Sequence, residues 1–517
     1  MDNKADKEKE ILIIGGGIAG LSAGIYARKN GYAATILEQH DKPGGQLTAW
    51  NRNGYRFDFC LQWLCGTRHG VYHGIWNELG AIQPASTTTS VIDIVVDHEI
   101  FIKLVDESGE YGEFFVYADM DRWEAYLKNE VAPEDAQGIH KLCTMIKTCA
   151  KLDEFENPPG MRSLWDYACY LYKSWSVIPV IVRYLKKSIK ELIDDLGLKN
   201  EKLRYVLTQF GQIGEDSELP ALGLLMMLAF QHDKNAGYLK GGSAAMTQRV
   251  REEYEKLGGK FKFNAKVVEI VVENHSVVRG VKLENGERVL ADHCISACDG
   301  HTVLYDMLGG GTYDVPSELK KPYEEWSVFT PLVMVAFGID KTIVSDAHDI
   351  GYFSPKSKIQ IGRTMADGYN IMNRSMYDDT LAPKGKTVLE IEFMSPWEIW
   401  ETLSDDEYAQ EKEDIKKRCI ELLEKHYSGV SANLEVFDLA TPRTTARVTG
   451  VWKGAYEGFV PGVNNLGTYL PTELDGLTNF SMAGQWVTPG GGLPPSAQSG
   501  RWAIQKLAKK DNKKFKH

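Results

Sequence analysis

The sequence predicts an α/β fold built around a dinucleotide-binding unit of the Rossmann type. Two observations predict it. Residues 11–14 form a short, wholly apolar run, and the glycine motif G-x-G-x-x-G follows at once. Residues 237–300 have the pattern of an amphipathic helix followed by several short strands. Buried strands alternating with helices are typical of a parallel sheet covered by helices.

The N-terminal unit places each residue type where dinucleotide binding needs it. Gly15 allows a tight turn, Gly17 lets the backbone approach a pyrophosphate, and Gly20 permits close packing of helix on strand. The start of the following helix offers free N–H groups and a positive dipole end to the phosphates. Glu38 closes a second strand, 33–38, about where a ribose-binding carboxylate is expected. We therefore predict a bound dinucleotide.

A second glycine pair indicates which dinucleotide this is. Gly44 and Gly45 follow Glu38 closely, and the aromatic and acidic run "NGYRFDF", with Asp58, comes next. This order resembles that of FAD proteins of the glutathione-reductase and amine-oxidase type. The resemblance implies FAD as the cofactor.

Residues 237–300 extend the resemblance. A glycine turn precedes a helix at 244–257, and short strands then surround Asn285-Gly286, which is a strong hairpin signal. This segment resembles the second cofactor segment of phytoene desaturases, carotenoid cis-trans isomerases and retinol saturases. In those families the valine that matches Val267 hydrogen-bonds the adenine through its backbone, so the resemblance implies that role here.

The C-terminal run "AGQWVTPGGGLPPSAQSG", 483–500, resembles the third cofactor segment of the same families. There, a strand ends in a glycine beside the ribityl and pyrophosphate groups, and a glycine-rich loop passes the flavin ring before the last helix. We expect backbone N–H groups of residues 490–493, and a helix beginning near Pro494 or Pro495, to face the negative charge of reduced flavin.

The resemblance covers nearly the whole chain and implies how it is divided. A Rossmann-type, glutathione-reductase-like FAD domain is expected from three separate segments, 1–70, 236–301 and 444–517. Residues 71–150 and 302–443 are expected to form a mixed-sheet substrate domain, and 151–235 a helical lid. The residues expected to bind FAD are Gly15, Gly17, Ile18, Ala19, Gly20, Glu38, Gln39, Gly44, Gly45, Gln46, Val267, Gly484, Gln485, Gly491, Gly492 and Leu493.

The chain departs from the family pattern at three positions. Gln46 stands where a basic residue often follows the second glycine pair, and Cys60 follows Asp58 closely where glycine is common. Gln485 stands where an acid often follows the glycine equivalent to Gly484. These differences leave FAD as the predicted cofactor and bear on its fine contacts.

The resemblance implies an FAD-dependent oxidoreductase that acts on carbon–carbon bonds of a long apolar substrate, such as a carotenoid, isoprenoid or retinoid. Desaturation, saturation and isomerisation stay open. Catalytic side chains and a metal site are not predicted, and His69, His73, His301 and Tyr305 are expected to be structural. A flavin amine oxidase and a flavin-binding protein without turnover remain alternatives. A thioredoxin reductase is disfavoured, because the chain lacks C-x-x-C and a second G-x-G-x-x-G.

Composition limits the other functions. The net charge of -12 disfavours nucleic-acid binding, and the eight cysteines have the spacing of reduced thiols. We find no signal-peptide core before residue 11, so a cytoplasmic protein is predicted. Residues 164–193 combine aromatic, apolar and basic side chains, which suits either core packing under a lid or peripheral contact with a membrane. The oligomeric state is not predicted.

Overall fold

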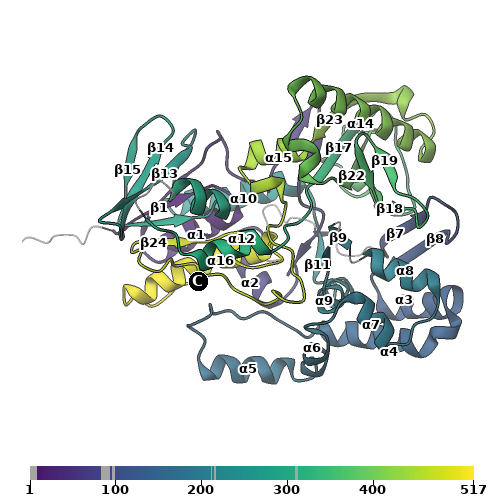
Figure 1. Cartoon of the computed structure of the whole chain (residues 1–517), viewed down its shortest axis with the longest axis horizontal. Helices are drawn as coiled ribbons and strands as arrows, with labels where there is room; N and C mark the ends of the chain where they lie inside the picture. Colours follow the sequence, from purple (N-terminus) through teal and green to yellow (C-terminus); the bar gives the residue numbers. More distant parts are fainter. Residues whose placement is uncertain (1–7, 83–93, 96–98, 211, 215–216, 309–312) are drawn as a thin grey trace, which may run out of the picture.

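A parallel sheet of five strands carries the glycine motifs. The computed structural model describes residues 8–82, 94–95, 99–210, 212–214, 217–308 and 313–517. The strand order is β12 (Lys260–Lys262), β2 (Ala33–Leu37), β1 (Glu10–Ile14), β16 (His293–Ser296) and β24 (Phe480–Met482). Every neighbouring pair is parallel. Strands from the beginning, the middle and the end of the chain thus share one sheet (Figure 1).

Two helices cross in backbone contact beside this sheet. They are α1 (Ile18–Lys29), which follows the first glycine motif, and α16 (Leu493–Lys510), which follows the C-terminal glycine loop. A Cβ atom on Gly500 would lie 2.3 Å from the carbonyl oxygen of Ala19, so only glycine allows this crossing. Ser22 Oγ donates to the carbonyl of Ala497 at 2.6 Å in the same contact. The crossing holds the two ends of the chain together.

The predicted helix and meander of the middle segment are present. Helix α10 (Gly242–Lys256) precedes β12, and an antiparallel sheet follows from β13 (Val267–Glu273), β14 (Val277–Leu283) and β15 (Arg288–Leu290). The turn between β14 and β15 contains Gly286, whose φ of 87° suits glycine. The prediction of a hairpin at this point is confirmed.

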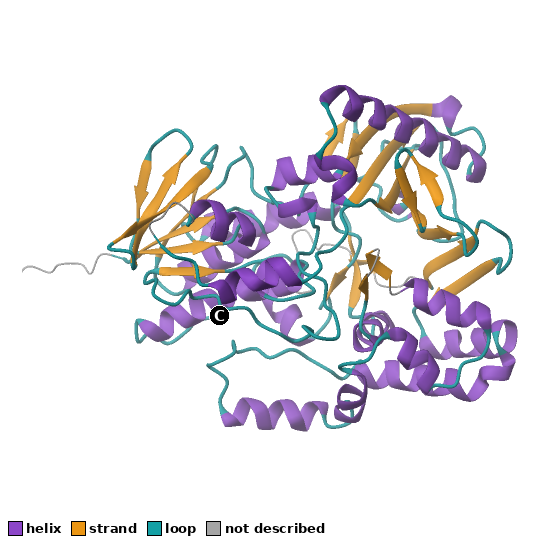
Figure 2. Ribbon diagram, in the orientation of Figure 1, coloured by secondary structure: helices purple, strands orange, loops and turns teal. Residues whose placement is uncertain are grey.

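A seven-stranded mixed sheet forms the second layer, as predicted for the inserted segments (Figure 2). The pair β18–β7 is parallel and the other neighbouring pairs are antiparallel. Helix α14 (Asp405–His426) packs on one face of the sheet through buried side chains such as Ile415 and Leu422. In order across the sheet, the strands are β23 (Leu434–Ala440), β17 (Leu332–Ile339), β22 (Thr387–Met394), β21 (Gly368–Met372), β18 (Asp349–Phe353), β7 (Ile100–Asp106) and β8 (Glu113–Tyr117).

Helices form the third layer, at the lower right of Figure 1. All of them except α5 contribute to one apolar core, and α9, which contains the run "ALGLLMMLAF", lies within it. That run is therefore packed in the core. The layer begins at Met120, earlier than the expected lid boundary at residue 151. Its helices are α3 (Met120–Tyr126), α4 (Ala136–Cys149), α5 (Leu164–Ser174), α6 (Ile178–Tyr184), α7 (Ile189–Asp195), α8 (Glu201–Phe210) and α9 (Ala221–His232).

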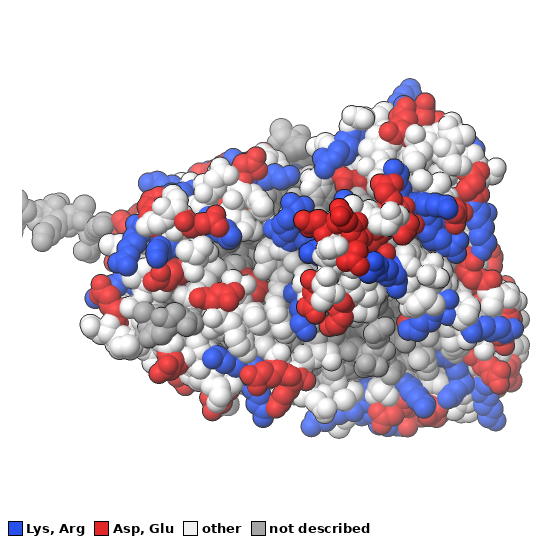
Figure 3. All heavy atoms as spheres, turned by 45° about the horizontal axis from the view of Figure 1, so that its top comes forward, with Lys and Arg blue, Asp and Glu red and all other residues white. Residues whose placement is uncertain are grey.

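Shorter elements connect the layers. The apolar run "VIDIVV", 91–96, predicts a strand, and only β6 (Ile94–Val95) of this run lies within the described residues. On the face shown in Figure 3, acidic and basic side chains are interspersed. The connecting elements include β3 (Ala49–Arg52), β4 (Tyr55–Asp58), β5 (Leu64–Cys65), α2 (Gly70–Glu78), β9 (Gln212–Gly214), β10 (Ser217–Glu218), β11 (Ala236–Leu239), α11 (Gly300–Thr302), α12 (Ser317–Glu325), β19 (Ile359–Ile361), β20 (Thr364–Ala366), α13 (Trp397–Glu401) and α15 (Pro442–Thr449).

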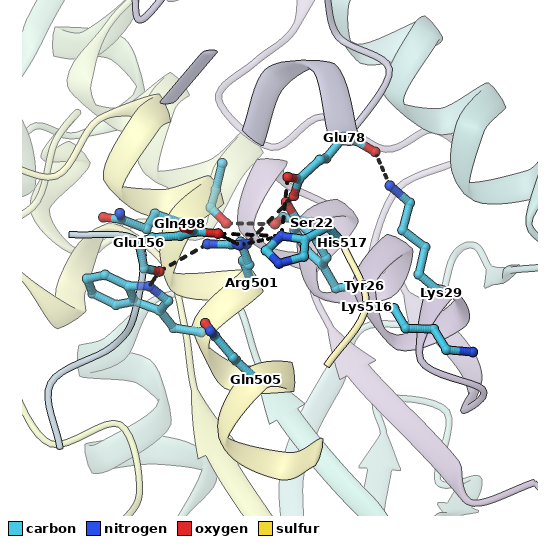
Figure 4. A network of polar contacts seen from close by, with 12 residues as sticks. Ser22, Tyr26, Lys29, Glu78, Glu156, Gln498, Arg501, Gln505, Lys516 and His517 are labelled. Carbon is cyan, nitrogen blue, oxygen red and sulfur yellow. Dashed lines mark hydrogen bonds and ion pairs between the residues drawn. The ribbon is translucent and has the colours of Figure 1, made fainter. Parts of the chain in front are cut away.

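A buried arginine on α16 ties the C-terminus to the segment that leads into α5 (Figure 4). Arg501 Nη2 lies 2.8 Å from Glu156 Oε1 and 2.7 Å from His517 Nδ1, and Nη1 donates to the carbonyl of Glu156 at 3.0 Å. Its Nε lies 3.7 Å from Glu78 Oε2, and Glu78 also accepts from the hydroxyl of Tyr26 on α1. One guanidinium therefore joins α16, α1, α2 and the chain terminus.

We expect Arg501→Met to lower the free energy of unfolding by about 2 kcal/mol, because it leaves the polar partners of a buried cation unsatisfied. Urea or thermal unfolding measures the loss. Arg279→Met is the matched control, since Arg279 pairs with Glu273 at the surface, and its effect is expected below about 0.5 kcal/mol. Equal effects of the two substitutions would contradict a stabilising role for the Arg501 network.

Candidate functional site

One large cavity connects the three layers. Its volume is about 1540 Å³, and it begins at the carboxyl ends of β1, β2, β16 and β24. Ligands of open α/β sheets bind at this edge. Sites for a single drug-sized molecule measure roughly 300–1000 Å³, so this cavity has room for more than one such ligand.

The two N-terminal glycine motifs contact each other at the mouth of this cavity. The N–H of Gly44 donates to the carbonyl of Gly16 at 2.9 Å, and Gly17 pairs with Gly44 in a parallel bridge. A Cβ atom on Gly17 would meet no described protein atom closer than 3.9 Å. Space therefore exists beside the backbone of Gly17, where a side chain would compete with a ligand.

Glu38 lies directly after β2, one residue beyond the strand that was predicted to include it. Its buried carboxylate accepts from the N–H of Gly16 at 2.8 Å through Oε2 and from the N–H of His40 at 3.0 Å through Oε1. Both hydrogen bonds orient the carboxylate, and each oxygen keeps a further lone pair. Glu38 also lines the cavity, as a ribose-binding acid must.

The C-terminal glycine segment lines the same cavity beside Ala19, near the start of α1. Gly484 has a φ of 113°, and a Cβ atom there would meet no described protein atom closer than 3.9 Å. Its N–H donates to Ser499 Oγ at 2.8 Å, which fixes the loop against α16. Helix α16 begins at Leu493 with Gly492 as its N-cap, close to the predicted start. Its first N–H groups have no acceptor within the helix.

One of the expected flavin-facing donors is already used within the protein. The N–H of Gly490 donates to the carbonyl of Phe459 at 2.8 Å, so the prediction for Gly490 is wrong. The reason is tertiary, because the segment around residue 459 packs against the glycine loop. The predicted N–H groups at 491–493 remain at the cavity wall.

Three of the residues that we predict to contact the cofactor are glutamines, and their side chains contact one segment around residues 448–455. Gln39 donates to the carbonyl of Val448 at 3.2 Å, and Gln485 donates to that of Ala455 at 3.3 Å. Gln46 contacts the Ala455 carbonyl at the longer distance of 3.5 Å. Their amides thereby attach the chain around 448–455 across the cofactor end of the cavity.

The structure brings nearly all the predicted cofactor residues together. Gly20 is the exception, because it packs α1 against β1 and does not reach the cavity. Those that line the cavity are Gly15, Gly17, Ile18, Ala19, Glu38, Gln39, Gly44, Gly45, Gln46, Val267, Gly484, Gln485, Gly491, Gly492 and Leu493.

The side chains expected to be structural lie outside the cavity lining. His69 pairs with Asp233 at 2.5 Å, and His73 Nδ1 lies 3.0 Å from the Thr67 carbonyl. His301 stacks between Tyr305 and Trp452. Among the residues that the structure describes, no three His, Cys, Asp or Glu side chains are placed to hold a metal ion.

Beyond the glycine segments the cavity becomes apolar. It passes between the mixed sheet, where Leu104 and Phe353 line it, and the helical layer. Most of the helical side chains that line it come from α6 and α9 and the residue after α6. The large apolar ones among these are Ile181, Leu185, Leu222, Met226, Met227 and Phe230. Tyr170 of α5, Gln209 of α8 and Gln231 of α9 also line the cavity. The large apolar side chains suit an extended hydrocarbon.

The face of the mixed sheet that lines the cavity, called the sheet floor below, contains acids that were not predicted. Glu392 stands on β22 between Met334 of β17 and Asn370 of β21, and its Oε2 accepts from Gln62. Its other carboxylate oxygen is buried and has no hydrogen-bond partner among the residues described. The pKa of Glu392 is raised to about 8, mainly by burial, with Arg374 opposing the rise and nearby Glu390 adding to it. At neutral pH the carboxyl group is therefore mostly protonated.

Two other groups complete the polar part of the cavity. Arg374 lines the cavity and donates to Glu390 at 2.5 Å in a buried ion pair. Glu457 lines the cavity beside Gly492, and burial raises the pKa of its carboxyl to about 7. The sequence signal for the sheet acids is the alternation of Glu390 and Glu392 with apolar residues along β22.

Comparison with known proteins identifies the family. A model described as flavin containing amine oxidoreductase matches residues 18–506. The chain belongs to this family. It is therefore an enzyme, a flavin-dependent oxidoreductase, with the α/β fold of the flavin amine oxidases.

Relatives match along nearly the full length. The 4,4'-diapophytoene desaturase (4,4'-diapolycopene-forming) of Methylomonas sp is 24% identical over 534 residues, covering 98% of this chain and 97% of the relative. The chloroplastic prolycopene isomerase of Daucus carota is 22% identical over 511 residues, covering 97% of this chain and 80% of the relative. A solved structure of a putrescine oxidase variant has a TM-score of 0.63 at 16% identity, covering 97% and 99% of the two chains, and shows the shared fold.

The acid on the sheet floor predicts a pH dependence. Unfolded, Glu392 ionises near its ordinary pKa of 4.5, whereas folded it retains its proton up to about pH 8. The folded state then binds more protons between these values, so this group lowers stability as pH rises from about 5 to 8. We expect Glu392→Gln to remove that contribution and to raise the melting temperature at pH 8 by about 1–3 °C.

Melting curves of wild type and Glu392→Gln at pH 5.5 and pH 8 measure this effect. The difference between the two proteins should be larger at pH 8. Glu273→Gln is the control, because Glu273 is an exposed acid, and it should leave the pH dependence unchanged. A pH-independent difference for Glu392→Gln would mean that the folded carboxyl is ionised throughout this range.

Proposed function

We propose that this enzyme binds FAD at the glycine-lined end of the cavity and transfers a hydride between the flavin and a carbon–carbon bond of a long apolar polyene. The observation that supports the proposal is the continuity of one cavity, from Gly17 and Gly484 to the apolar side chains of α6 and α9. A cofactor at one end and a hydrocarbon at the other would meet inside it.

FAD fits the residues present at the glycine end. Free space beside Gly17 and Gly484 leaves backbone open to a ligand, and the starts of α1 and α16 favour negative charge. Glu38 is oriented by two backbone N–H groups and can accept ribose hydroxyls. Bound flavin supplies a ring that accepts or donates a hydride.

The protein's own contribution to the reaction is positioning. The row Met334, Glu392 and Asn370 crosses the sheet floor, while α9 covers the cavity from the other side. Such walls would hold an extended chain and keep water away from the reacting carbon. The named activities of the Methylomonas and carrot relatives, desaturation and isomerisation, are consistent with a carotenoid-like substrate. Desaturation, saturation and isomerisation all use this arrangement.

The acidic floor favours a second candidate, oxidation of an amine. The unpartnered oxygen of Glu392 would accept from an ammonium group, and ionisation of that carboxyl would then be favoured by the cation. The apolar walls along α6 and α9 favour the polyene instead. Anaerobic titration of the oxidised enzyme with a polyene and with a primary amine distinguishes the two substrates.

Gly17→Ala should abolish stoichiometric FAD binding, because its Cβ would project into the space that the pyrophosphate needs. The protein has no atom closer than 3.9 Å to that Cβ, and Gly17 has an ordinary φ of -72°, so the fold should tolerate alanine. Absorbance near the flavin bands, together with the melting temperature of the apoprotein, measures both effects. We expect at least about tenfold weaker binding and an apoprotein that melts within about 2 °C of wild type.

Gly74→Ala is the control, since a Cβ atom there meets nothing within 4 Å and Gly74 lies on α2 outside the cavity lining. It should retain FAD fully. Retained FAD in Gly17→Ala would contradict the proposed path of the cofactor.

Anaerobic titration of the oxidised holoenzyme with a micellar acyclic polyene tests the reaction. Bleaching of the flavin bands, with a product of longer conjugation, is the expected result for a desaturase. If the oxidised flavin does not respond, the prereduced enzyme is titrated next, and consumption of the polyene supports saturation or isomerisation. Bleaching of the oxidised enzyme by a primary amine, with no conversion of the polyene by either the oxidised or the prereduced enzyme, would overturn the polyene proposal.

A further inference from the structure

Helices α5 and α6 expose large apolar side chains to an unusual degree. Their exposed fractions are 90% for Leu164, 75% for Trp165, 52% for Leu171, 82% for Tyr172, 72% for Trp175 and 78% for Val182. These six side chains are called the lid face below. Core packing, one of the two interpretations of 164–193, therefore fails for α5. In Figure 1, α5 lies along the lower edge of the molecule, apart from the core of the helical layer.

The exposure follows the helical period. Leu164, Leu171 and Trp175 recur at spacings of seven and four, and Trp165 and Tyr172 lie beside them at a spacing of seven. Residues at these spacings share one side of a helix. The apolar side chains therefore form a stripe along α5 rather than a scatter of single exposed residues.

The other side of α5 is anchored to the protein. Tyr170 stacks on Phe155 with ring centroids 4.1 Å apart, and the carbonyl of Phe155 accepts from Gln498 on α16 at 3.0 Å. A capping box between Ser163 and Asp166 closes the start of the helix. The fold thus holds α5 in place with its lid face directed outward.

The chemistry of this face matches a lipid surface. Trp and Tyr are enriched where a protein meets the membrane–water interface, because their rings are apolar and their N–H or O–H groups need polar partners. Exposed basic residues lie in the same segment of the chain at Lys173, Arg183 and Lys186, of which Arg183 pairs with Asp195 at 3.3 Å. Anionic headgroups attract such residues over short range, although the whole chain has a net charge of -12.

The cavity supplies an independent argument. Tyr170 of α5, Ile181 of α6 and Leu185 line the cavity, so the segment that carries the lid face outside also borders the cavity inside. None of the helices in the described part of the chain is long and apolar enough to cross a bilayer. A helix with one apolar face and basic flanks lies in the plane of the interface.

We propose that the lid face docks on the surface of an anionic lipid bilayer, with α5 lying in the plane of the interface. The docking itself goes beyond the proposed function and requires no substrate. Its consequence for catalysis rests on the proposed function: the cavity would border the bilayer, so that a polyene dissolved there could enter without crossing water.

Vesicle flotation of the full-length holoenzyme tests the docking, with protein in the lipid fraction as the readout. Vesicles of phosphatidylcholine with 30% phosphatidylglycerol are compared with pure phosphatidylcholine, both without polyene. The triple substitution Trp165→Ser, Tyr172→Ser and Trp175→Ser should lower partitioning into the anionic vesicles by at least about tenfold. Leu290→Ser with Val344→Ser is the control, because both side chains are exposed but lie far along the chain from the lid face, and it should bind as wild type does.

The basic residues are tested separately. Lys173→Glu with Lys186→Glu should weaken binding to anionic vesicles by several fold, because two attractive charges become repulsive. Flavin absorbance of each variant verifies that the cofactor end is intact, so failure of docking is distinguishable from failure of the proposed function.

Three results would overturn the proposal. One is wild-type protein that floats with neither vesicle. Another is equal binding by the triple variant and wild type. The third is a concentration-dependent dimer, seen without lipid and lost in the triple variant, which would assign the lid face to a second copy of the chain.

Discussion

Helix α1 packs directly against other backbone on two sides, without side chains between, and the rest of the structure depends on this constraint. A Cβ atom on Gly20 would lie 2.0 Å from the carbonyl oxygen of Gly15, and one on Gly500 would lie 2.3 Å from that of Ala19. The first contact sets α1 against β1, and the second sets α16 against α1. Both helices therefore begin at the same edge of the parallel sheet. The two ends of the chain meet there, and the glycine loops that precede the two helices line one cavity.

The two ends of that cavity differ because different parts of the backbone build them. Loops and helix starts supply the first end, so main-chain N–H groups and glycines dominate it. Strand faces and helix sides supply the second end, so side chains decide its character. Glu392 is buried there with one oxygen unpartnered, which disfavours its charged form and lowers stability at neutral pH. Such strain is common where a protein keeps a group for function rather than for folding.

Most of the glycine-lined end of the cavity was predictable from the sequence, because its signals are local. Gly44 and Gly484 have positive φ angles, and Gly17 leaves open space beside its backbone. The surrounding glycine motifs reveal these positions, and Asn285-Gly286 marks its hairpin in the same way. The sheet acids were missed, because alternation along β22 shows which residues share a face but not what that face opposes. The N–H of Gly490 was assigned to a ligand, whereas Phe459, distant from the glycine motif in sequence, takes it.

The sequence by itself determined the α/β class, the glycine-lined site and the amphipathic character of the lid helices, because these depend on short-range geometry and residue type. Only the tertiary structure decided which side of each element faces the cavity. It placed α9 in the core and directed the apolar stripe of α5 outward, although both runs are rich in large apolar residues. The physical reason is that burial depends on which surfaces pack together, and that pairing involves segments hundreds of residues apart, such as Phe155 and Gln498.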